Sequence, residues 1–307
     1  MERSIRKAGW IAVSIVLGMA VSYSATAQGL TKVSDGVYSY VDAKQASPQS
    51  GFGANAGIVI GKDGILVVDT LVSAKQARQF IKDIRTITNR PIRYVVNTHG
   101  HLDHAFGDSE FQKLGAILVT HRDCKLDMAR NGEAVLKNAG AYGLAETEME
   151  GTTIARPAIS FADRMEIDLG DITVELIDPG PSHSPGSILV SIPREKVLFA
   201  GDALFTGYHP YLGDGNLEGW LKVLDRIGAM DADKIVPGHG PLSGKKDVAD
   251  MKEYLLAFDR NAKELCAGSG DVESIFSEIK KVLPQRAESD FLIKANLEMR
   301  YLKKRGE

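Results

Sequence analysis

The chain has 307 residues, 44% of them hydrophobic, which is enough to bury a sizeable core in one large domain or two small ones. Its formal net charge of −3 argues against nucleic acid as an obligate partner. Function is therefore expected in local motifs rather than in overall charge.

The first 27 residues have the pattern of an export signal. Three basic residues precede an apolar run over residues 11–21, and Ala-Thr-Ala at 25–27 is a small-x-small cleavage site. The apolar run is short for a membrane-spanning helix, and no cysteine follows it to carry a lipid. We expect cleavage before Gln28 and export, most simply to a bacterial periplasm, with no membrane attachment afterwards. A retained membrane anchor is the alternative.

The mature chain begins with strand and turn signals. Residues 57–61 and 65–69 predict a hairpin closed by Asp63-Gly64. Ser73 with Gln76 three residues later is a capping box, and apolar residues then recur at helical spacing until Pro91 closes the helix. The elements expected next are a strand at 92–97, a short helix at 106–114, a strand at 116–120 and helical structure over 122–150.

The second half alternates strands with a helix. We expect strands at 172–177, 187–192, 197–200 and 234–236, and a helix over 217–227. Strands and helices mixed in both halves predict an α/β sandwich with the sheets inside and the helices outside.

The chain from about residue 245 onward predicts two or three further helices. Met251, Tyr254, Leu255 and Phe258 form one apolar face, and the segment 275–283 carries another. This tail has no recognisable chemistry, so we expect it to pack as an outer layer or to form a dimer contact.

The two cysteines, Cys124 and Cys266, lie far apart in the sequence and away from the histidine motifs. They are either a disulfide or two buried thiols, and neither is assigned as a metal ligand.

Residues 98–104, Thr-His-Gly-His-Leu-Asp-His, place three imidazoles and a carboxylate directly after an apolar strand. Imidazole is the commonest borderline-soft metal ligand, and a carboxylate adds a hard oxygen. The spacing is not helical. From an extended loop His99 and His101 point the same way, whereas Asp103 and His104 diverge from them. One loop is therefore suited to serve two adjacent metal ions.

Four further polar residues each follow a strand-like run, where α/β proteins place their chemistry. His183 and His239 each lie beside Pro-Gly pairs, and Asp202 and Asp69 end apolar strands. Each has a plainer interpretation, as a loop histidine, a turn residue or a strand cap. Asp202 is suited to bridge two metals, and Asp69 to accept a hydrogen bond near the ligand loops.

The order of these motifs resembles the metallo-β-lactamase superfamily, over about residues 30–245. The resemblance implies a four-layer αββα sandwich with a dinuclear site, usually zinc, at the edge between its two halves. By motif, one ion falls to His99, His101 and His183, the second to Asp103, His104 and His239, and Asp202 bridges them. We accordingly divide the chain into a signal peptide (1–27), a metallo-β-lactamase-like hydrolase domain (28–245) and a C-terminal helical extension (246–307).

The implied chemistry is hydrolysis of a small-molecule substrate. A hydroxide bridging two zinc ions would attack a carbonyl, with Asp103 holding and orienting it as the catalytic residue. Iron or manganese are alternative metals. By the same resemblance, di-iron relatives replace the second histidine by glutamate, whereas this chain keeps His101.

The local motifs lie closest to periplasmic zinc β-lactamases that carry a cysteine ligand, but three positions differ. Asp202 stands in place of that cysteine, Phe205 in place of a lysine and Tyr211 near the position of an asparagine, so two groups that grip a lactam acid are missing. At the opening of the predicted metal site, Phe205, Tyr208, His209 and Tyr211 are expected to contact substrate. The alternative is that these side chains only pack their loop onto the body of the protein. The Gly-rich stretch 50–53 is a candidate flap, and His121 is expected to be structural.

These features predict an exported dinuclear zinc hydrolase that cleaves an ester, lactone, thioester or amide, including β-lactams. The alternatives are a β-lactamase proper, a sulfatase or phosphodiesterase on the same fold, or a non-catalytic metal-binding module.

Overall fold

A computed structural model of the chain describes residues 29–41, 52–268, 270–286 and 288–302. The predicted signal peptide and residues 50–51 of the candidate flap lie outside these ranges. Within them, no helix combines the length and the apolar character that crossing a bilayer requires.

The first sheet has seven strands in the order of the chain. They are β1 (Thr31–Ser34), β2 (Val37–Ser39), β3 (Gly57–Gly61), β4 (Gly64–Val68), β5 (Ile92–Val96), β6 (Ile117–His121) and β7 (Ile159–Phe161). The strands from β1 to β4 pair antiparallel, and those from β4 to β7 pair parallel. The predicted hairpin is therefore β3–β4, and it leads into the parallel part that carries the histidine motif.

The second sheet has five strands in the order β12-β11-β10-β9-β8. They are β8 (Arg164–Asp168), β9 (Thr173–Ile177), β10 (Leu189–Ile192), β11 (Val197–Phe205) and β12 (Lys234–His239). Only β11 and β12 pair parallel, so both strands end at the same edge of the sheet.

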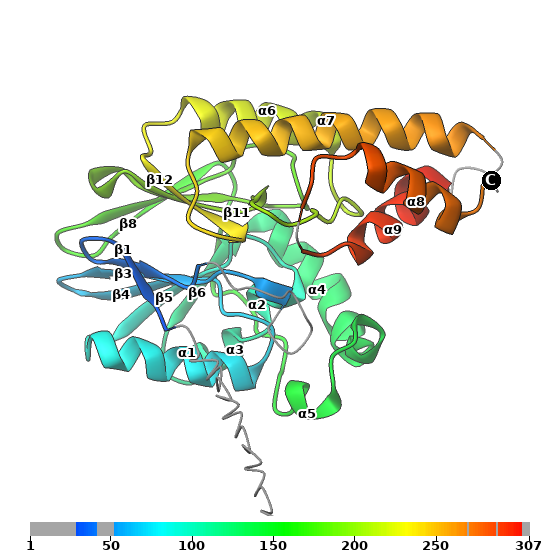
Figure 1. Cartoon of the computed structure of the whole chain (residues 1–307). Helices are drawn as coiled ribbons and strands as arrows, with labels where there is room; N and C mark the ends of the chain where they lie inside the picture. Colours follow the sequence, from blue (N-terminus) through cyan, green and yellow to red (C-terminus); the bar gives the residue numbers. More distant parts are fainter. Residues whose placement is uncertain (1–28, 42–51, 269, 287, 303–307) are drawn as a thin grey trace, which may run out of the picture.

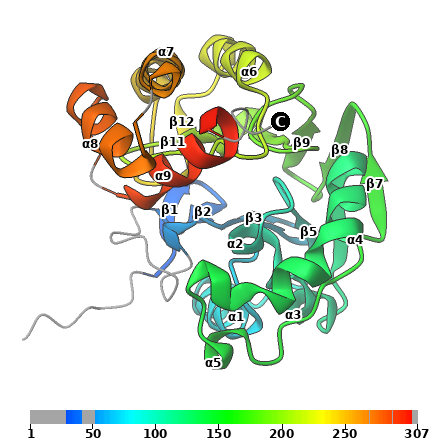
Figure 2. The same ribbon diagram turned by 90° about the vertical axis from the view of Figure 1, so that its right-hand side faces the viewer.

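The two sheets pack face to face and each is covered by helices (Figures 1 and 2). Val96 and Val236 belong to the apolar layer between the sheets, whereas Val95 faces α1 (Ala74–Ile87) and α3 (Asp108–Gln112). The outer face of the second sheet packs against α6 (Leu217–Ala229) and α7 (Lys245–Ala267). The αββα sandwich predicted from the sequence is confirmed.

Several predicted bounds are wrong in detail. The helix expected at 106–114 is the shorter α3, and a further short helix that was not predicted, α2 (Leu102–Ala105), begins inside the histidine motif. The helical stretch expected over 122–150 is interrupted, because Asn138 ends α4 (Arg122–Lys137) and Gly143 takes a left-handed φ of 77° after the short η2 (Ala139–Tyr142). A third piece is α5 (Glu146–Met149), and β7 and β8 were not foreseen.

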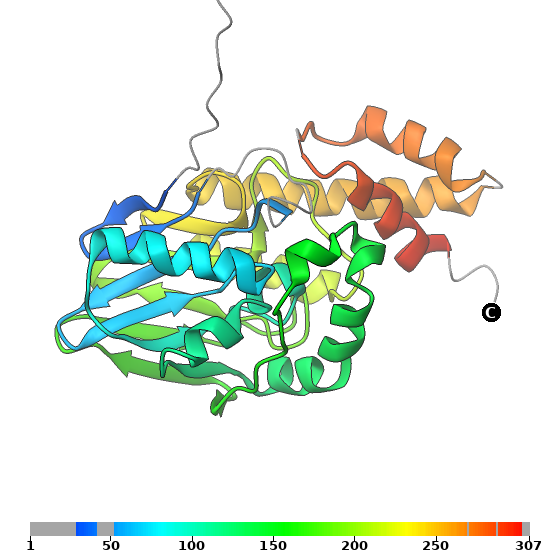
Figure 3. The same cartoon turned by 90° about the horizontal axis from the view of Figure 1, so that it is seen from below.

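The C-terminal helices are α7, α8 (Val272–Val282) and α9 (Phe291–Leu297), followed by the π-helical turn η4 (Glu298–Leu302). Figure 3 shows α8 and α9 beside the distal part of α7, beyond one end of the sheets. The predicted apolar faces are buried, and they join the same cluster as β11 and α6. The extension is thus continuous with the core of the second sheet.

Both cysteines are buried thiols and do not form a disulfide, with Cys124 under the histidine motif beside Met128 and Cys266 on α7. Of the two outcomes left open by the sequence, the structure shows buried thiols.

Candidate metal centre

The histidine motif is extended in its first half and helical in its second. β5 ends at Val96, His101 occupies the N-cap position of α2, and Asp103 and His104 lie within α2. The expectation of an extended loop is therefore correct only up to His101. The helical turn is what sends Asp103 and His104 to a different side from the first two histidines.

Asp69 holds this motif in place from the end of β4. Its carboxylate accepts hydrogen bonds from the Thr98 amide and hydroxyl, both at 2.7 Å, and from His104 Nδ1 at 2.9 Å. Asp69 itself has a φ of 60°, a left-handed conformation that aspartate tolerates better than most residues. Asp69 was predicted to accept a hydrogen bond near the ligand loops, and in the structure it accepts such bonds from Thr98 and His104.

The predicted ligands come together as two adjoining groups. One contains His99, His101, His183 and Asp202, and the other Asp103, His104 and His239, with the candidate ligand atoms of each group within 4.8 Å of one another. In the first group His101 Nδ1 lies 2.9 Å from His183 Nε2, and in the second His239 Nε2 lies 3.4 Å from Asp103 Oδ2.

Asp202 lies between the two groups, with one oxygen toward each. Its Oδ2 is 3.2 Å from His183 Nε2 and 3.8 Å from His99 Nε2. Its Oδ1 is 3.0 Å from His104 Nε2 and 3.4 Å from His239 Nε2. A carboxylate placed in this way is suited to bridge two cations.

Several atoms of the cluster are buried without a hydrogen-bond partner. Three of them, His99 Nε2, His104 Nε2 and Asp202 Oδ1, face the cluster, and the last two lie 3.0 Å apart without the geometry of a hydrogen bond. A buried polar atom left without a partner costs free energy, so such atoms call for an explanation. Divalent cations would satisfy all three, and the nitrogen and oxygen donors suit zinc, iron or manganese.

The electrostatics of the cluster keep lone pairs available on two of the buried imidazoles, those of His183 and His99. Burial lowers the pKa of His183 to about 3 and holds the pKa of His99 well below its ordinary value. Burial also lowers the pKa of His104, but Asp202, Asp103 and Asp69 outweigh it and raise that pKa well above the ordinary value. A metal ion would take the place of the proton that these carboxylates attract to His104.

Three of the five clustered imidazoles are oriented by other side chains. In each, the ring nitrogen that faces away from the candidate ligand atoms contacts a hydroxyl or a carboxylate. His99 Nδ1 lies 3.1 Å from the Thr98 hydroxyl, His104 Nδ1 contacts Asp69, and His101 Nε2 lies 3.1 Å from Asp214 Oδ2. Such outer partners fix the tautomer and ring orientation of a ligating histidine.

Asp214 is the residue that sequence reasoning missed. It lies on the loop before α6, 113 residues from its partner His101, and its pKa is lowered chiefly by that hydrogen bond. The Gly-Asp-Gly turn at 213–215 was visible in the sequence, but nothing local indicated where its carboxylate points.

The four residues expected to contact substrate have different surroundings. Phe205 is only 2% exposed and stacks on His239 with ring centroids 4.8 Å apart, so it packs behind a candidate ligand. Tyr208 is also buried, 5.7 Å from the His239 ring. Tyr211 is the half-exposed member, with its ring 5.7 Å from that of His101.

His209 points away from the cluster. Its Nδ1 lies 2.6 Å from the Tyr254 hydroxyl on α7, and its Nε2 lies 3.1 Å from Asp290 Oδ1 beside α9. Both ring nitrogens are therefore engaged with the C-terminal helices, and this geometry corrects the expectation of a substrate contact.

The described part of the candidate flap rests on the second ligand group. The Phe52 carbonyl oxygen lies 3.2 Å from His239 Nδ1, and Ala54 forms a bridge with His239. His121, expected to be structural, accepts a hydrogen bond from the Asp123 amide and caps α4.

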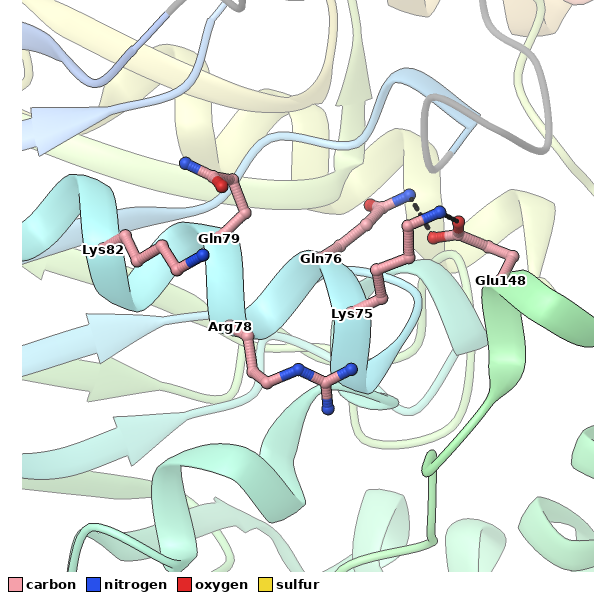
Figure 4. A pocket seen from close by; sticks show the side chains of 6 residues that line it. All are labelled: Lys75, Gln76, Arg78, Gln79, Lys82 and Glu148. Atoms are coloured by element: carbon pink, nitrogen blue, oxygen red, sulfur yellow. Dashed lines mark hydrogen bonds and ion pairs between the residues drawn. The ribbon is translucent and has the colours of Figure 1, made fainter.

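A separate cavity of about 400 Å³ lies over α1 and shares no residue with the cluster (Figure 4). The Glu148 carboxylate accepts hydrogen bonds there from Ser73, Gln76 and Lys75. These bonds tie α5 to the start of α1, which is a structural role.

Comparisons with known proteins relate the chain to one family. A family model described as the metallo-beta-lactamase superfamily matches residues 50–239. The chain is 28% identical to the alpha subunit of 2,4-dinitroanisole O-demethylase from a Nocardioides species, over 75% of this chain and 66% of that subunit. It is 25% identical to the linear primary-alkylsulfatase of a Pseudomonas species, over 62% of this chain and 42% of that protein. The chain thus spans less than two thirds of either relative.

Shorter relatives and solved structures also include metallo-beta-lactamases. Metallo-beta-lactamase type 2 of Bacteroides fragilis is 22% identical, over 74% of this chain and 84% of that enzyme. A metallo-beta-lactamase structure from Pontibacter korlensis has a TM-score of 0.61 at 23% identity, covering 74% of this chain and 98% of the other. A double mutant of the sec-alkyl sulfatase PisA1 has a TM-score of 0.64 at 17% identity, covering 89% of this chain and 50% of the other. At these identities the structural likeness shows the fold.

Proposed function

Because the chain belongs to the metallo-beta-lactamase superfamily, we propose that it is an exported hydrolase with a centre of two divalent metal ions, most simply zinc. The proposed substrate is an uncharged carbonyl compound, namely an ester, lactone, thioester or amide. The observation that supports two ions is the position of Asp202, which has one carboxylate oxygen toward each group of ligands.

In this proposal His99, His101 and His183 hold one ion, Asp103, His104 and His239 hold the other, and Asp202 is shared. Two such ions, when bound, supply hydroxide near neutral pH and polarise a substrate oxygen. Asp103 is the more exposed of the cluster's two aspartates, at 13% of its side chain against 5% for Asp202. It is therefore placed to accept a hydrogen bond from attacking water and to orient it.

The surroundings of the cluster favour a neutral substrate. Among the described residues, the ion-pair partners of Asp69, Asp103, Asp202 and Asp214 are all histidines, with no lysine or arginine within 4 Å. Phe205 is packed against His239 where related lactamases place a carboxylate-gripping lysine, as the resemblance implies. An acidic lactam would therefore lack its anchor, whereas an apolar group would meet Tyr211 at the mouth.

A second candidate is hydrolysis of alkyl sulfate esters. It is favoured by the alkylsulfatase relative, which is 25% identical over 62% of this chain. The absence of a cation beside the described cluster counts against it, because a sulfate group carries charge through the reaction.

The test combines metal content with a substrate panel. We expect the purified protein to hold about two zinc ions per chain and to turn over aryl esters, lactones or thioesters faster than β-lactams, alkyl sulfates or phosphodiesters. His101→Ala should abolish turnover and lower the metal content, with circular dichroism showing that it is folded. Full activity in His101→Ala would exclude the proposed centre, and fastest turnover of alkyl sulfates would replace the substrate class.

Export is tested on the protein from cells. We expect the mature N-terminus to be Gln28, found by N-terminal sequencing of a periplasmic extract. An uncleaved chain in the membrane fraction would instead support a retained anchor.

A further inference from the structure

The segment between β11 and α6, residues 206–216, lies between the metal ligands and the C-terminal helices. On one side it presents Tyr211 and Asp214 to His101. On the other side it contacts the α9–η4 region, which follows it by more than 80 residues. A connecting segment of this length is mobile by default, so its conformation needs external support.

Asn296 on α9 supplies two of the supporting bonds. Its side chain is fully buried, its Nδ2 donates to the Pro210 carbonyl at 2.8 Å, and its Oδ1 accepts from the Leu212 amide at 2.7 Å. An asparagine that donates to one residue and accepts from the next but one imitates the pairing of a neighbouring strand. It fixes the backbone on both sides of Tyr211.

Arg300 on η4 supplies two more. Its Nη1 donates to the Leu212 carbonyl at 2.7 Å and to the Gly215 carbonyl at 2.6 Å. These two acceptors lie on either side of the turn that carries Asp214. Arg300 therefore holds the turn closed where the Asp214 carboxylate leaves it for His101.

These contacts differ from ordinary packing of an outer helix. Apolar burial is not directional and would hold α9 against the core without specifying the backbone of residues 210–215. Four hydrogen bonds from two side chains specify it, and the Tyr211 hydroxyl adds a contact to Met299 Sδ at 3.4 Å. The C-terminal tail, expected from the sequence to have no part in the chemistry, thus touches the wall of the candidate site.

We propose that Asn296 and Arg300 are positioning residues of the metal centre. They hold the 210–215 backbone so that Asp214 bonds His101 Nε2, which orients His101 Nδ1 toward His183 and so sets the affinity of the first metal ion. The metal-affinity part of this inference rests on the proposed function. The coupling of Asn296 and Arg300 to the loop and to Asp214 does not.

The main test is a double-mutant cycle on Arg300→Met and Asp214→Ala, because methionine keeps the stem of the half-buried arginine without its donors. Zinc affinity is measured by competition with a chromophoric chelator. We expect Arg300→Met alone to weaken one of the two zinc ions about 10-fold or more, the size typical of lost outer-shell support. In the Asp214→Ala background, Arg300→Met should weaken zinc affinity by a further factor of less than about 2.

Arg260→Met is the matched control, because Arg260 is an exposed arginine on α7 of the same extension. It should leave both affinities unchanged. An equal effect of Arg300→Met with and without Asp214, or no effect at all, would overturn the positioning role while leaving the metal centre standing.

A second measurement does not depend on metal. In the metal-free protein, hydrogen exchange of the Leu212 amide should be about 10-fold faster or more in Arg300→Met and in Asn296→Leu than in the wild type or Arg260→Met. Unchanged exchange in Arg300→Met contradicts the proposal, even if Asn296→Leu fails to fold. A wild-type protein that binds no zinc would instead refute the proposed function, and the exchange result would then decide alone whether these residues hold the loop.

Discussion

Asp202 lies in β11 with imidazole nitrogens around both of its oxygens, and it is 5% exposed. Burial alone would raise the pKa of such a carboxyl, but the neighbouring histidines hold it well below its ordinary value. The side chain is therefore an anion in the interior, and its free energy depends on positive charge nearby. Two metal ions would provide that charge.

Asp202→Asn should lower the zinc content from about two ions to one or fewer and reduce turnover by at least about 100-fold. The physical reason is that asparagine is neutral and can offer only one ligand oxygen. Zinc per chain is measured by elemental analysis. Asp231→Asn is the control, because that carboxylate is 80% exposed and pairs only with the surface Lys196 among the described residues. Two zinc ions in Asp202→Asn would contradict the bridging role.

His209 was expected from the sequence to contact substrate, but both of its ring nitrogens contact the C-terminal helices. Burial lowers its pKa to about 4, although the Asp290 carboxylate beside it acts in the opposite direction. Arg286 and Lys280 add to the lowering, and the Tyr254 hydroxyl contacts the other ring nitrogen. The imidazole of His209 is therefore neutral in the folded protein near pH 7. It links the segment after β11 to the C-terminal helices.

The stability of the protein should consequently depend on pH through His209. An unfolded histidine has a pKa of about 6.5, so between pH 6.5 and 4 the unfolded chain takes up roughly one proton that the folded chain does not. The contribution is complete above pH 6.5 and is lost as the pH falls toward 4. Urea unfolding of metal-free protein at several pH values should show a weaker pH dependence in His209→Gln. Identical slopes would contradict the assignment.

At the scale of elements, the decisive contact is the parallel pair β11–β12. Gly201 pairs with Pro237, and the register shifts on both sides of this pair, which brings Asp202 and His239 to the same edge. Gly238 lies directly against the bridging residue, because a Cβ at this position would be 1.8 Å from Asp202 Oδ1 and 2.9 Å from the Asp202 amide nitrogen. Glycine is needed there for close approach rather than for backbone freedom.

Gly238→Ala should therefore displace the Asp202 carboxylate and lower zinc affinity by at least about 10-fold, with a loss of stability of about 1–3 kcal/mol from overpacking. Gly228→Ala is an informative control, since nothing lies within 4 Å of its Cβ position on α6. In a helix that change should raise stability by about 0.5–1 kcal/mol and leave zinc binding unchanged. Both are followed by denaturant unfolding and zinc competition. Equal zinc affinities in the two variants would refute this account.

At the scale of the whole molecule, the candidate metal centre joins parts of the chain that are far apart. His99 and His104 follow β5 of the first sheet, Asp202 and His239 belong to the second sheet, and Arg300 of the C-terminal extension bonds the loop that carries Asp214. An ion bound only by the folded state adds to the stability of the whole arrangement, by about 2.7 kcal/mol at a free concentration 100 times its Kd.

Removing zinc with a chelator should accordingly lower the Tm by roughly 5–10 °C for each ion lost, given about 2–4 °C per kcal/mol for a protein of this size. Added zinc should restore the Tm, and the His101→Ala variant should show a smaller decrease. The measurement is thermal unfolding followed by circular dichroism. A Tm that does not change while zinc is removed would show that the ions are not linked to folding.

Much of the fold could be predicted from local pattern. The hairpin at 57–68 was predicted from its Asp-Gly turn, and the start of α1 from Ser73. The Ser73 hydroxyl oxygen does accept a hydrogen bond from the Gln76 amide. The errors came where tertiary contacts override local pattern. α2 begins inside the histidine motif because Asp69 holds Thr98 and His104 from outside it. Asp202 is in β11 rather than after it, because β12 continues the pairing.

By itself, the sequence determined the donor atoms, their order and the family, because these depend on residue identity and spacing along the chain. Only the tertiary structure decided which carboxylate meets which imidazole, that His209 turns away from the site, and that Asp214 turns toward His101. It also decided that Asn296 and Arg300 bond the backbone of the loop that carries Asp214. The reason is physical: a hydrogen bond between residues 84 to 113 positions apart leaves no trace in local periodicity, and it exists only once the sheets and the C-terminal helices have packed.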